Sequence, residues 1–384
     1  MKRINAAIAA MLCAVLIFCG CVRVEVTETD DVKTSADVAE INETISIFAL
    51  GDNLLHMPVI NSGKQNDGTY EYSHLFELLQ PNIKNADIAV IGQETVFGGE
   101  KFGYSGYPLF NSPSDMGKTL VSEGFDVVLH ASNHVLDKWA EGIENTLAFW
   151  KGYPDITVLG INDSEEDKQS IDIKEVKGAR IALLNYTYGT NGLVLPRGKE
   201  YLVNYIDENK MQTDIVYAEE NTDFTIAFMH WGTEYSIKPD DFQKNLAQKM
   251  CEWGVDLIIG SHPHVIEPVE WIESENGNRM LVYYSLGNFV SRQKEARNLL
   301  GGAADVKLKF DGEKVTIEDY AFVPIVTHYD TTYTRFAVYP LDLYTDEMAA
   351  QHGVTPHDGA VSLERWKNMI TETFEGYDIN VLEE

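Results

Sequence analysis

The chain has 384 residues, of which 60 are acidic and 30 basic, so its formal net charge at pH 7 is −30. This charge argues against nucleic acid and anionic lipid surfaces as binding partners. It would also repel a polyanion unless metal ions, a local basic patch or counterions intervene, although acidic composition is equally common in exported proteins that only need to stay soluble. Three of the four cysteines lie within the first 21 residues, so we expect no internal disulfide in the folded part, which keeps only Cys251.

The N-terminal segment has the pattern of an export signal. A basic start, Met1–Arg3, precedes the apolar run Ile4–Gly20, which is too short to span a membrane comfortably. The run ends in Phe18-Cys19-Gly20-Cys21, which is similar to a lipobox, so we expect residues 1–21 to be a lipoprotein signal peptide and Cys21 to carry lipid. An uncleaved anchor and an ordinary secreted form are the alternatives. Residues 22–43 are predicted to be a flexible tether that holds the body outside the cytoplasm, anchored to the cell membrane.

Apolar runs that read as buried strands end in polar residues at five points along the body. In chain order they are Ile45–Leu50 before Gly51-Asp52, Ala86–Ile91 before Gly92-Gln93-Glu94, Phe125–Leu129 before His130–His134, Phe224–Met229 before His230, and Val255–Ile259 before Gly260–His264. Because ligands bind outside the carboxyl ends of strands in open α/β sheets, we expect these five ends to form one site.

Helical and hairpin patterns lie between and after these strands. Helices are predicted at 114–123, 138–151, 211–221, 241–253 and 362–374, and hairpins at 171–186, 269–285 and 306–323, each with a glycine turn. The alternation of strands and helices with late hairpins predicts two packed sheets between helices. We expect one α/β domain over residues 44–325 and a C-terminal extension of the same domain over 326–384.

The residue types at the strand ends favour a metal site. Imidazole binds Zn, Fe, Mn and Ni well, and His262 and His264 bracket Pro263, which fixes the chain between them. His230 follows another strand, and Asp52 and Glu94 add carboxylates from earlier ones. Packing of these side chains in the core is the alternative. The donor set predicts a divalent ion such as Mn, Fe or Zn, in one or two copies.

Several multi-residue motifs identify a family resemblance. The chain reads His-Trp-Gly-Thr-Glu-Tyr at 230–235, Gly-Ser-His-Pro-His at 260–264 and Tyr-Ser-Leu-Gly-Asn-Phe at 284–289, with Gly51-Asp52 and Ala131–Asp137 at the front. Over residues 45–325 it resembles the bacterial capsule synthesis CapA family, associated with poly-γ-glutamate capsule, within the calcineurin-like metallophosphoesterases. The resemblance implies a metallophosphatase-like four-layer α/β/β/α sandwich.

The resemblance also implies roles for individual residues. Glu94 would bridge metal ions, Asn133 would coordinate through its amide oxygen, and His134 would face the substrate as a general acid or transition-state stabiliser. Asp137 would either orient His134 or cap the following helix. Glu234, Tyr235 and Asn288 are candidate substrate-binding residues, with a simple turn as the alternative for Asn288.

The chain departs from the family pattern at three positions. Asp52 is followed by Asn53 and Leu54, so the Asp-x-His of the phosphoesterases is absent and one metal position loses a ligand unless His56 reaches the site. Gly92 stands where relatives often have Asn, and Trp139 where they often have Gly. We therefore expect one tightly held ion near Glu94, Asn133, His230 and His262, and a weaker one near Asp52 and His264.

Two functions fit the resemblance. The first is a metal-dependent hydrolase or transferase that acts on an anionic capsule polymer or an envelope precursor. The second is a non-catalytic, polymer-binding subunit of a poly-γ-glutamate synthesis and export complex. Both predict membrane proteins of capsule synthesis or export as partners.

Overall fold

The computed structural model describes residues 42–377 and 379–381, which belong to one compact unit, Glu40–Glu384. The predicted signal peptide, the tether up to residue 41 and the lipidation at Cys21 lie outside the described residues and stay predictions. Among the described residues, no helix is long and apolar enough to cross a membrane.

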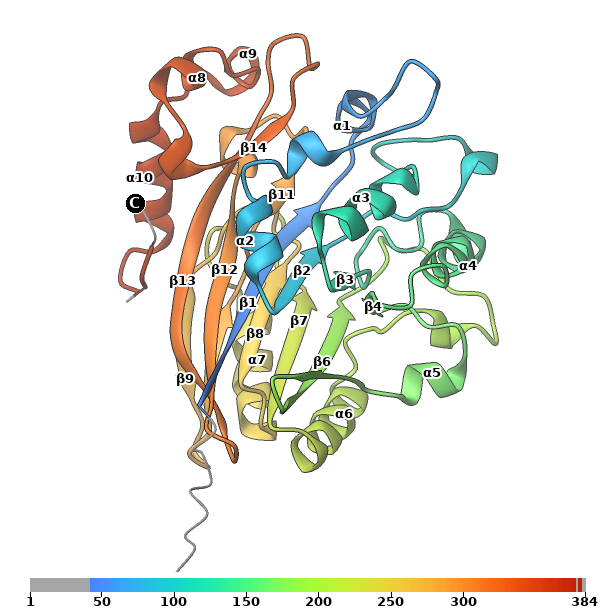
Figure 1. The fold of residues 1–384 in the computed structure, drawn as a ribbon, viewed down its shortest axis with the longest axis vertical. Coiled ribbons are helices and arrows are strands. Elements are labelled where there is room, and N and C mark those ends of the chain that lie inside the picture. Colours follow the sequence, from blue (N-terminus) through green and yellow to red (C-terminus); the bar gives the residue numbers. More distant parts are fainter. Residues whose placement is uncertain (1–41, 378, 382–384) are drawn as a thin grey trace, which may run out of the picture. The chain divides into compact units, whose positions relative to one another are not determined.

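The first sheet has the strand order β14-β13-β12-β1-β2-β3-β4, with β11 pairing separately with β1 (Figure 1). β1 to β4 run parallel, whereas β12, β13 and β14 run antiparallel to their neighbours. The strands are β1 (Glu43–Asn53), β2 (Ile88–Gly92), β3 (Val127–Leu129), β4 (Thr157–Leu159), β11 (Asn288–Val290), β12 (Leu300–Phe310), β13 (Val315–His328) and β14 (Ala337–Pro340).

The second sheet has the order β5-β6-β7-β8-β10-β9. β6, β7, β8 and β10 are parallel, and the hairpin partners β5 and β9 form the antiparallel edges. The strands are β5 (Asp172–Val176), β6 (Ala179–Thr187), β7 (Phe224–His230), β8 (Leu257–Ser261), β9 (Val269–Glu273) and β10 (Arg279–Tyr283).

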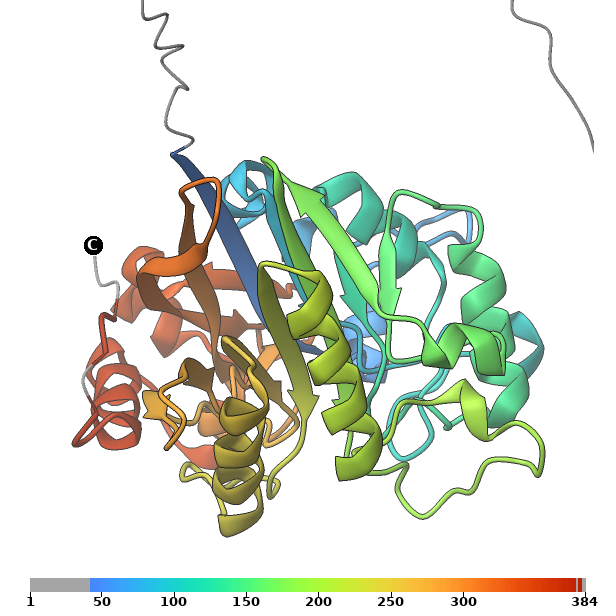
Figure 2. The same ribbon diagram turned by 90° about the horizontal axis from the view of Figure 1, so that it is seen from below.

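Helices cover the outer faces of the two sheets, as Figures 1 and 2 show. α2 (Gln80–Asn85), α3 (Asp115–Glu123) and α4 (Trp139–Trp150) lie beside the first sheet, and α6 (Glu208–Asn221) and α7 (Asp241–Trp253) cover the second. One apolar cluster joins residues of both sheets, and another joins the second sheet to α6 and α7. The expected α/β/β/α layering is confirmed.

Short helices connect these elements. They are α1 (Met57–Ser62), η1 (Ser73–Leu75), η2 (Glu100–Phe102), α5 (Glu165–Gln169), η3 (Glu200–Leu202) and η4 (Ala296–Leu299). The C-terminal part adds η5 (Leu341–Leu343), α8 (Asp346–Ala350), α9 (Thr355–Asp358) and α10 (Leu363–Thr373). The boundary expected at residue 326 falls inside β13, so the extension shares a strand with the first sheet. Phe374, which directly follows α10, contacts that strand, with its ring centroid 5.0 Å from that of Phe322.

Close approach of backbones explains two glycines at the ends of strands. A Cβ at Gly51 would lie 2.0 Å from the carbonyl oxygen of Gly287, and one at Gly260 would lie 1.9 Å from that of Tyr284. Only glycine therefore lets the last residues of β1 and β8 meet the segment 284–288. This contact brings the carboxyl ends of the two sheets together at one edge.

Candidate metal centre

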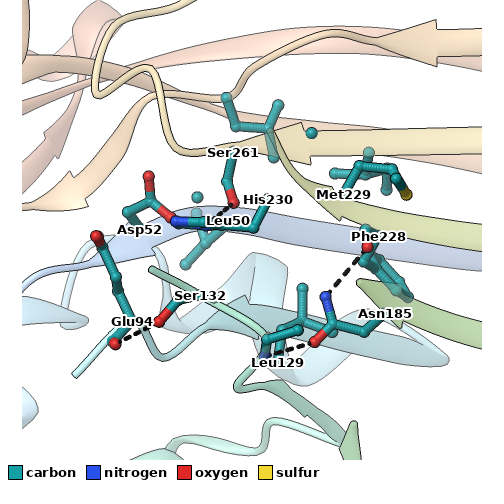
Figure 3. A pocket seen from close by; sticks show the side chains of 16 residues that line it. Leu50, Asp52, Glu94, Leu129, Ser132, Asn185, Phe228, Met229, His230 and Ser261 are labelled. Carbon is teal, nitrogen blue, oxygen red and sulfur yellow. Dashed lines mark hydrogen bonds and ion pairs between the residues drawn. The ribbon is translucent and has the colours of Figure 1, made fainter. Parts of the chain in front are cut away.

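Three buried side chains could hold a metal ion at this edge. Ligand atoms of Asp52, Glu94 and His264 all lie within 4.8 Å of one another. His264 Nδ1 is 3.6 Å from Asp52 Oδ2, and its Nε2 is 3.9 Å from Glu94 Oε1. We call these residues the carboxylate cluster. Figure 3 shows Asp52 and Glu94 beside a small cavity between the sheets, which His230 also lines.

The charges of the carboxylate cluster are poorly compensated by the protein itself. Both carboxylate oxygens of Glu94 are buried and have no hydrogen-bond partner among the described residues. Burial raises the pKa of Glu94 well above its ordinary value, although His264 opposes the rise. Burial lowers the pKa of His264, but Glu94 and Asp52 raise it more, to about 9. Buried anionic oxygens without donors are costly unless a cation pairs with them, so these residues fit a divalent ion.

Three further predicted ligands, Asn133, His230 and His262, lie next to this group, and we call them the imidazole cluster. Asn133 Oδ1 and His230 Nε2 are 3.1 Å apart, and His230 Nδ1 is 3.1 Å from Ser261 Oγ. His262 Nδ1 is buried without a partner in the described part of the chain. Burial lowers the pKa of His262 to about 3 and that of His230 well below its ordinary value, so both rings are neutral, as metal-binding imidazoles must be.

The backbone around Pro263 is held in an unusual conformation. His262 has φ of 99° and His264 φ of 58°, a region that side chains other than glycine rarely adopt. The backbone N–H of His262 donates to Asp52 Oδ2 at 3.0 Å, and the carbonyl of Pro263 accepts from Tyr235 N at 2.8 Å. These bonds hold the strained turn in place and direct both imidazoles toward the same edge, as expected of strain kept at a functional site.

Asn288 orients His264 rather than closing a simple turn. Its Oδ1 lies 3.0 Å from His264 Nδ1, and its amide nitrogen donates to the carbonyl oxygen of Asn298 at 2.8 Å. Because the amide nitrogen is used in this way, its oxygen faces His264 and accepts the Nδ1 proton. The lone pair of a neutral His264 then lies on Nε2, the atom nearest Glu94.

His134 and Asp137 form a buried pair beside the ligands. His134 Nδ1 lies 2.7 Å from Asp137 Oδ2, which also accepts the backbone N–H of Phe110 at 2.7 Å. The helix α4 begins after Lys138 without a side-chain cap, so Asp137 contacts the imidazole and does not cap the helix. The ring of Phe110 packs on His134 with centroids 4.7 Å apart. This pair has the geometry of an oriented acid or base.

The substrate-binding candidates of the 230–235 motif lie at the surface of the site. Glu234 is exposed, and Tyr235 is half exposed with its ring centroid 6.2 Å from that of His264. Sequence reasoning missed Tyr188, whose ring lies 4.5 Å from His262 and nearly parallel to His230. Tyr188 follows the end of β6, so the strand-end argument could have found it had it been applied to that hairpin strand.

His56 does not replace the missing histidine after Asp52. Its Nδ1 accepts the backbone N–H of Arg292 at 3.2 Å. Burial and the nearby His264 lower its pKa to about 4, so the ring is neutral. A neutral imidazole that accepts at Nδ1 carries its proton on Nε2, which leaves no free lone pair for a metal.

The comparisons with known proteins identify the family. The family model described as bacterial capsule synthesis protein PGA_cap matches residues 46–293, which include all predicted ligands. The chain belongs to this capsule synthesis family. The resemblance drawn from the motifs is therefore confirmed.

Two CapA proteins of Bacillus and one solved structure are similar to the chain. The chain is 35% identical over 206 residues to the PGA biosynthesis protein CapA of Bacillus subtilis (strain 168), covering 51% of this chain and 50% of the relative. It is 25% identical over 282 residues to the capsule biosynthesis protein CapA of Bacillus anthracis, covering 71% and 66%. The calcineurin-like phosphoesterase YfkN from Bacillus subtilis aligns with a TM-score of 0.43 and 15% identity, covering 87% of this chain and 97% of that one. The chain thus spans half to two thirds of these CapA relatives.

Proposed function

We propose that this protein is an exported, membrane-anchored, metal-dependent hydrolase or transferase that acts on a capsule polymer, poly-γ-glutamate, or on its precursor. The observation that carries the proposal is the carboxylate cluster, in which Glu94 buries two oxygens without donors beside the oriented His134–Asp137 pair. Membership of the capsule synthesis family supports the polymer.

The proposed ligands of one or two ions are the residues of both clusters, Asp52, Glu94, Asn133, His230, His262 and His264. Their oxygen and nitrogen donors suit Mn, Fe or Zn. When bound, such an ion polarises the electrophile and makes water a better nucleophile at neutral pH.

In this proposal His134 and Asp137 handle the proton that is transferred to the leaving group. Asp137 accepts the Nδ1 proton of His134 and so fixes the tautomer, which makes Nε2 the atom that exchanges a proton with the leaving group. Phe110 packs on the ring and restricts its rotation. Glu234 and Tyr235 at the surface are proposed to contact the substrate.

Two matched histidine variants test this assignment. We expect His262→Ala to lower the metal content, because it removes a ligand, whereas His134→Ala keeps the metal and loses activity by about 100-fold or more. Metal content is measured by elemental analysis, and activity with phosphoesters and γ-glutamyl amides. Equal metal loss in both variants would show that His134 is a ligand, and activity retained in His134→Ala would contradict its catalytic role.

A non-catalytic, polymer-binding subunit of a synthesis and export complex is the second candidate. The missing histidine after Asp52 and the engaged Nδ1 of His56 favour it, because they leave one metal position with fewer ligands. Metal-dependent binding of poly-γ-glutamate without cleavage of any substrate would support this candidate over the enzyme. Membrane proteins of capsule synthesis or export are the proposed partners in either case.

The anchoring part of the proposal rests on the lipobox-like Phe18–Cys21. We expect the mature chain to begin at a lipid-modified Cys21 and to fractionate with membranes, whereas Cys21→Ser does not gain lipid. Cys19→Ser is the matched control and should keep the lipid. Mass spectrometry of the N-terminal peptide decides between the outcomes. An unmodified N-terminus in the medium would refute lipid anchoring.

A further inference from the structure

Four exposed aromatic side chains lie near residues of the candidate metal centre, three of them in loops and the fourth, Trp139, as the first residue of α4. Tyr107 is 75% exposed, Trp139 56%, Tyr235 52% and Tyr188 43%. Large aromatic side chains on a protein surface commonly mark binding sites when several of them gather around one feature. We call these four residues the mouth aromatics.

Ring contacts connect the mouth aromatics to the site. Tyr188 lies over His262 with ring centroids 4.5 Å apart, and Tyr235 lies 6.2 Å from His264. On the other side, Tyr107 contacts Phe110, the residue that packs on His134. Trp139 follows Asp137 by two residues. Tyr188 and Tyr235 therefore contact metal ligands, Tyr107 reaches His134 through Phe110, and Trp139, whose ring contacts Phe102, adjoins the His134–Asp137 pair in the chain.

Two mouth aromatics are kept at positions where the backbone disfavours them. Trp139 has φ of 55° and Tyr235 φ of 67°, a left-handed conformation that glycine adopts at much lower cost. Neither side chain is buried in the core: the Trp139 ring contacts Phe102, and the Tyr235 ring contacts His264. A strained backbone that presents an exposed aromatic ring beside a site points to a function outside the folded core.

Two of the cations near the mouth already have partners within the protein. Lys101 pairs with Glu141 at 2.6 Å, and the ammonium group of Lys138 donates to the carbonyl of Leu109. Glu234, beside Tyr235, is exposed. A ligand that binds here must gain its affinity from stacking and hydrogen bonds as well as from bound cations.

We propose that the mouth aromatics are the surface that grips the backbone of a linear polyamide chain and guides it to the metal centre. The inference rests on the proposed function for the identity of the polymer. The rings stack on the flat amide groups, the tyrosine hydroxyls bond to amide groups, and divalent ions neutralise the carboxylates. This arrangement explains how a protein with a net charge of −30 binds a polyanion.

The test measures binding of sodium poly-γ-glutamate of defined length to the full-length, metal-loaded protein by titration calorimetry. We expect Trp139→Gly and Tyr235→Ala each to weaken binding by about five- to tenfold, as for truncation of an interface aromatic, with metal content unchanged. The matched control is Tyr217→Ala on α6, which is 51% exposed and lies on the outer face of the second sheet. Its affinity should equal that of the wild type. Unchanged affinity in the mouth variants, or an equal loss in the control, would overturn the proposal.

Two further measurements exclude a merely structural role. Trp139→Gly should melt at the same or a higher temperature than the wild type, because glycine relieves the strain; a lower melting temperature would contradict a binding role. Trp139 is also the one exposed tryptophan in the described part of the chain, so polymer should protect its fluorescence from acrylamide quenching.

The outcomes separate this inference from the proposed function. If polymer binding depends on the mouth aromatics but no substrate is cleaved, the inference stands and the enzymatic role fails. If the protein holds metal and is active but binds polymer equally well in all variants, the inference fails alone. If chitooligosaccharides bind through the same residues and poly-γ-glutamate does not bind, the occupant is a glycan and the polyamide is excluded.

Discussion

The carboxylate cluster and the imidazole cluster differ in how many of their polar atoms already have hydrogen-bond partners within the protein. In the imidazole cluster, Asn133 and His230 bond to each other at 3.1 Å, so an ion must displace an existing contact. In the carboxylate cluster, Glu94 has two buried oxygens without partners among the described residues, and His264 alone offers positive charge. The geometry therefore favours a cation between Asp52, Glu94 and His264. From the sequence, we assigned Asp52 and His264 to the weaker ion and Glu94 to the tightly held one. The ranking of affinities stays a prediction.

The largest effect is expected from Glu94→Gln. Burial already raises the pKa of Glu94 well above its ordinary value and so favours its neutral form, so the free energy of unfolding of the metal-free protein should change little, whereas the variant lacks the carboxylate that would bind the metal. At a free metal concentration 100 times Kd, bound metal should raise the free energy of unfolding of the wild type by about 2.7 kcal/mol. It should raise that of the variant by less than half of this amount. Urea denaturation with and without metal measures both quantities.

Asp256→Asn is the matched control for this experiment. Asp256 precedes β8 at the end opposite the site, burial raises its pKa to about 8, and it accepts the backbone N–H of Thr225. Its amide variant should leave the stabilisation by metal unchanged. If Glu94→Gln keeps the full stabilisation by metal, the carboxylate cluster is not the binding position and the comparison between the clusters is reversed.

Asn288→Ala should have the next largest effect. The variant frees the ring of His264 and its tautomer, so we expect metal affinity to fall by about 10- to 100-fold, as for other residues that orient a ligand. Asn288→Asp keeps an acceptor for Nδ1 and should recover part of the loss. Ser291→Ala, which removes a weaker bond to the same amide at 3.3 Å, is the control. If Asn288→Ala binds metal as tightly as the wild type, Asn288 only closes the turn and does not orient His264.

The stability contributions of the two clusters should change in opposite directions with pH. His264 has a pKa raised to about 9 from its ordinary 6.5, so its contribution to stability is present below pH 6.5 and is lost as the pH rises through 9. His262 has a pKa lowered to about 3, so its contribution is present above pH 6.5 and is lost as the pH falls toward 3. Between pH 6.5 and 9, metal binding at the carboxylate cluster should release at least one proton, because the pKa values of both Glu94 and His264 are raised, whereas binding at the imidazole cluster should release none. Calorimetry in buffers of different ionisation enthalpy measures this number, and no proton release would place the ion at the imidazole cluster.

Local patterns predicted the layers of this fold because its central strands are buried on both faces. Ile88–Ile91 is continuously apolar and Phe224–Met229 is interrupted only by Thr225, as expected of parallel strands between helices, and Lys177-Gly178 marks a hairpin. The pairing of β11 was not predictable. Its residues follow a strand of the second sheet, yet Asn288 pairs with Asp52, 236 residues earlier, in the first sheet. Three residues are too few to show such a partner in the sequence.

The sequence predicted those residues of the site that lie at the ends of strands. Asp52, Glu94, His230 and His264 meet because parallel strands bring their carboxyl ends to one edge. The contacts that orient these residues could not be predicted from the sequence, because they join segments that come together only in the folded chain. Asn288 reaches His264 through a turn, and Tyr333 of the extension accepts a hydrogen bond from Arg292, whose backbone holds His56.

The smallest effect is expected from His56→Ala, which tests whether the carboxylate cluster has a further ligand. His56 carries its proton on Nε2 because Nδ1 accepts from Arg292, so its removal should change metal affinity by less than about twofold. The variant should still lose about 1–3 kcal/mol in free energy of unfolding, because the backbone N–H of Arg292 is left unpaired and the ring contact with Phe110 is lost. His56→Gln, which can still accept that hydrogen bond, should recover part of the stability without changing the affinity. A tenfold loss of affinity in both variants would mean that the ring turns on metal binding and supplies the ligand that the sequence after Asp52 lacks, which would make the centre a more complete phosphoesterase site.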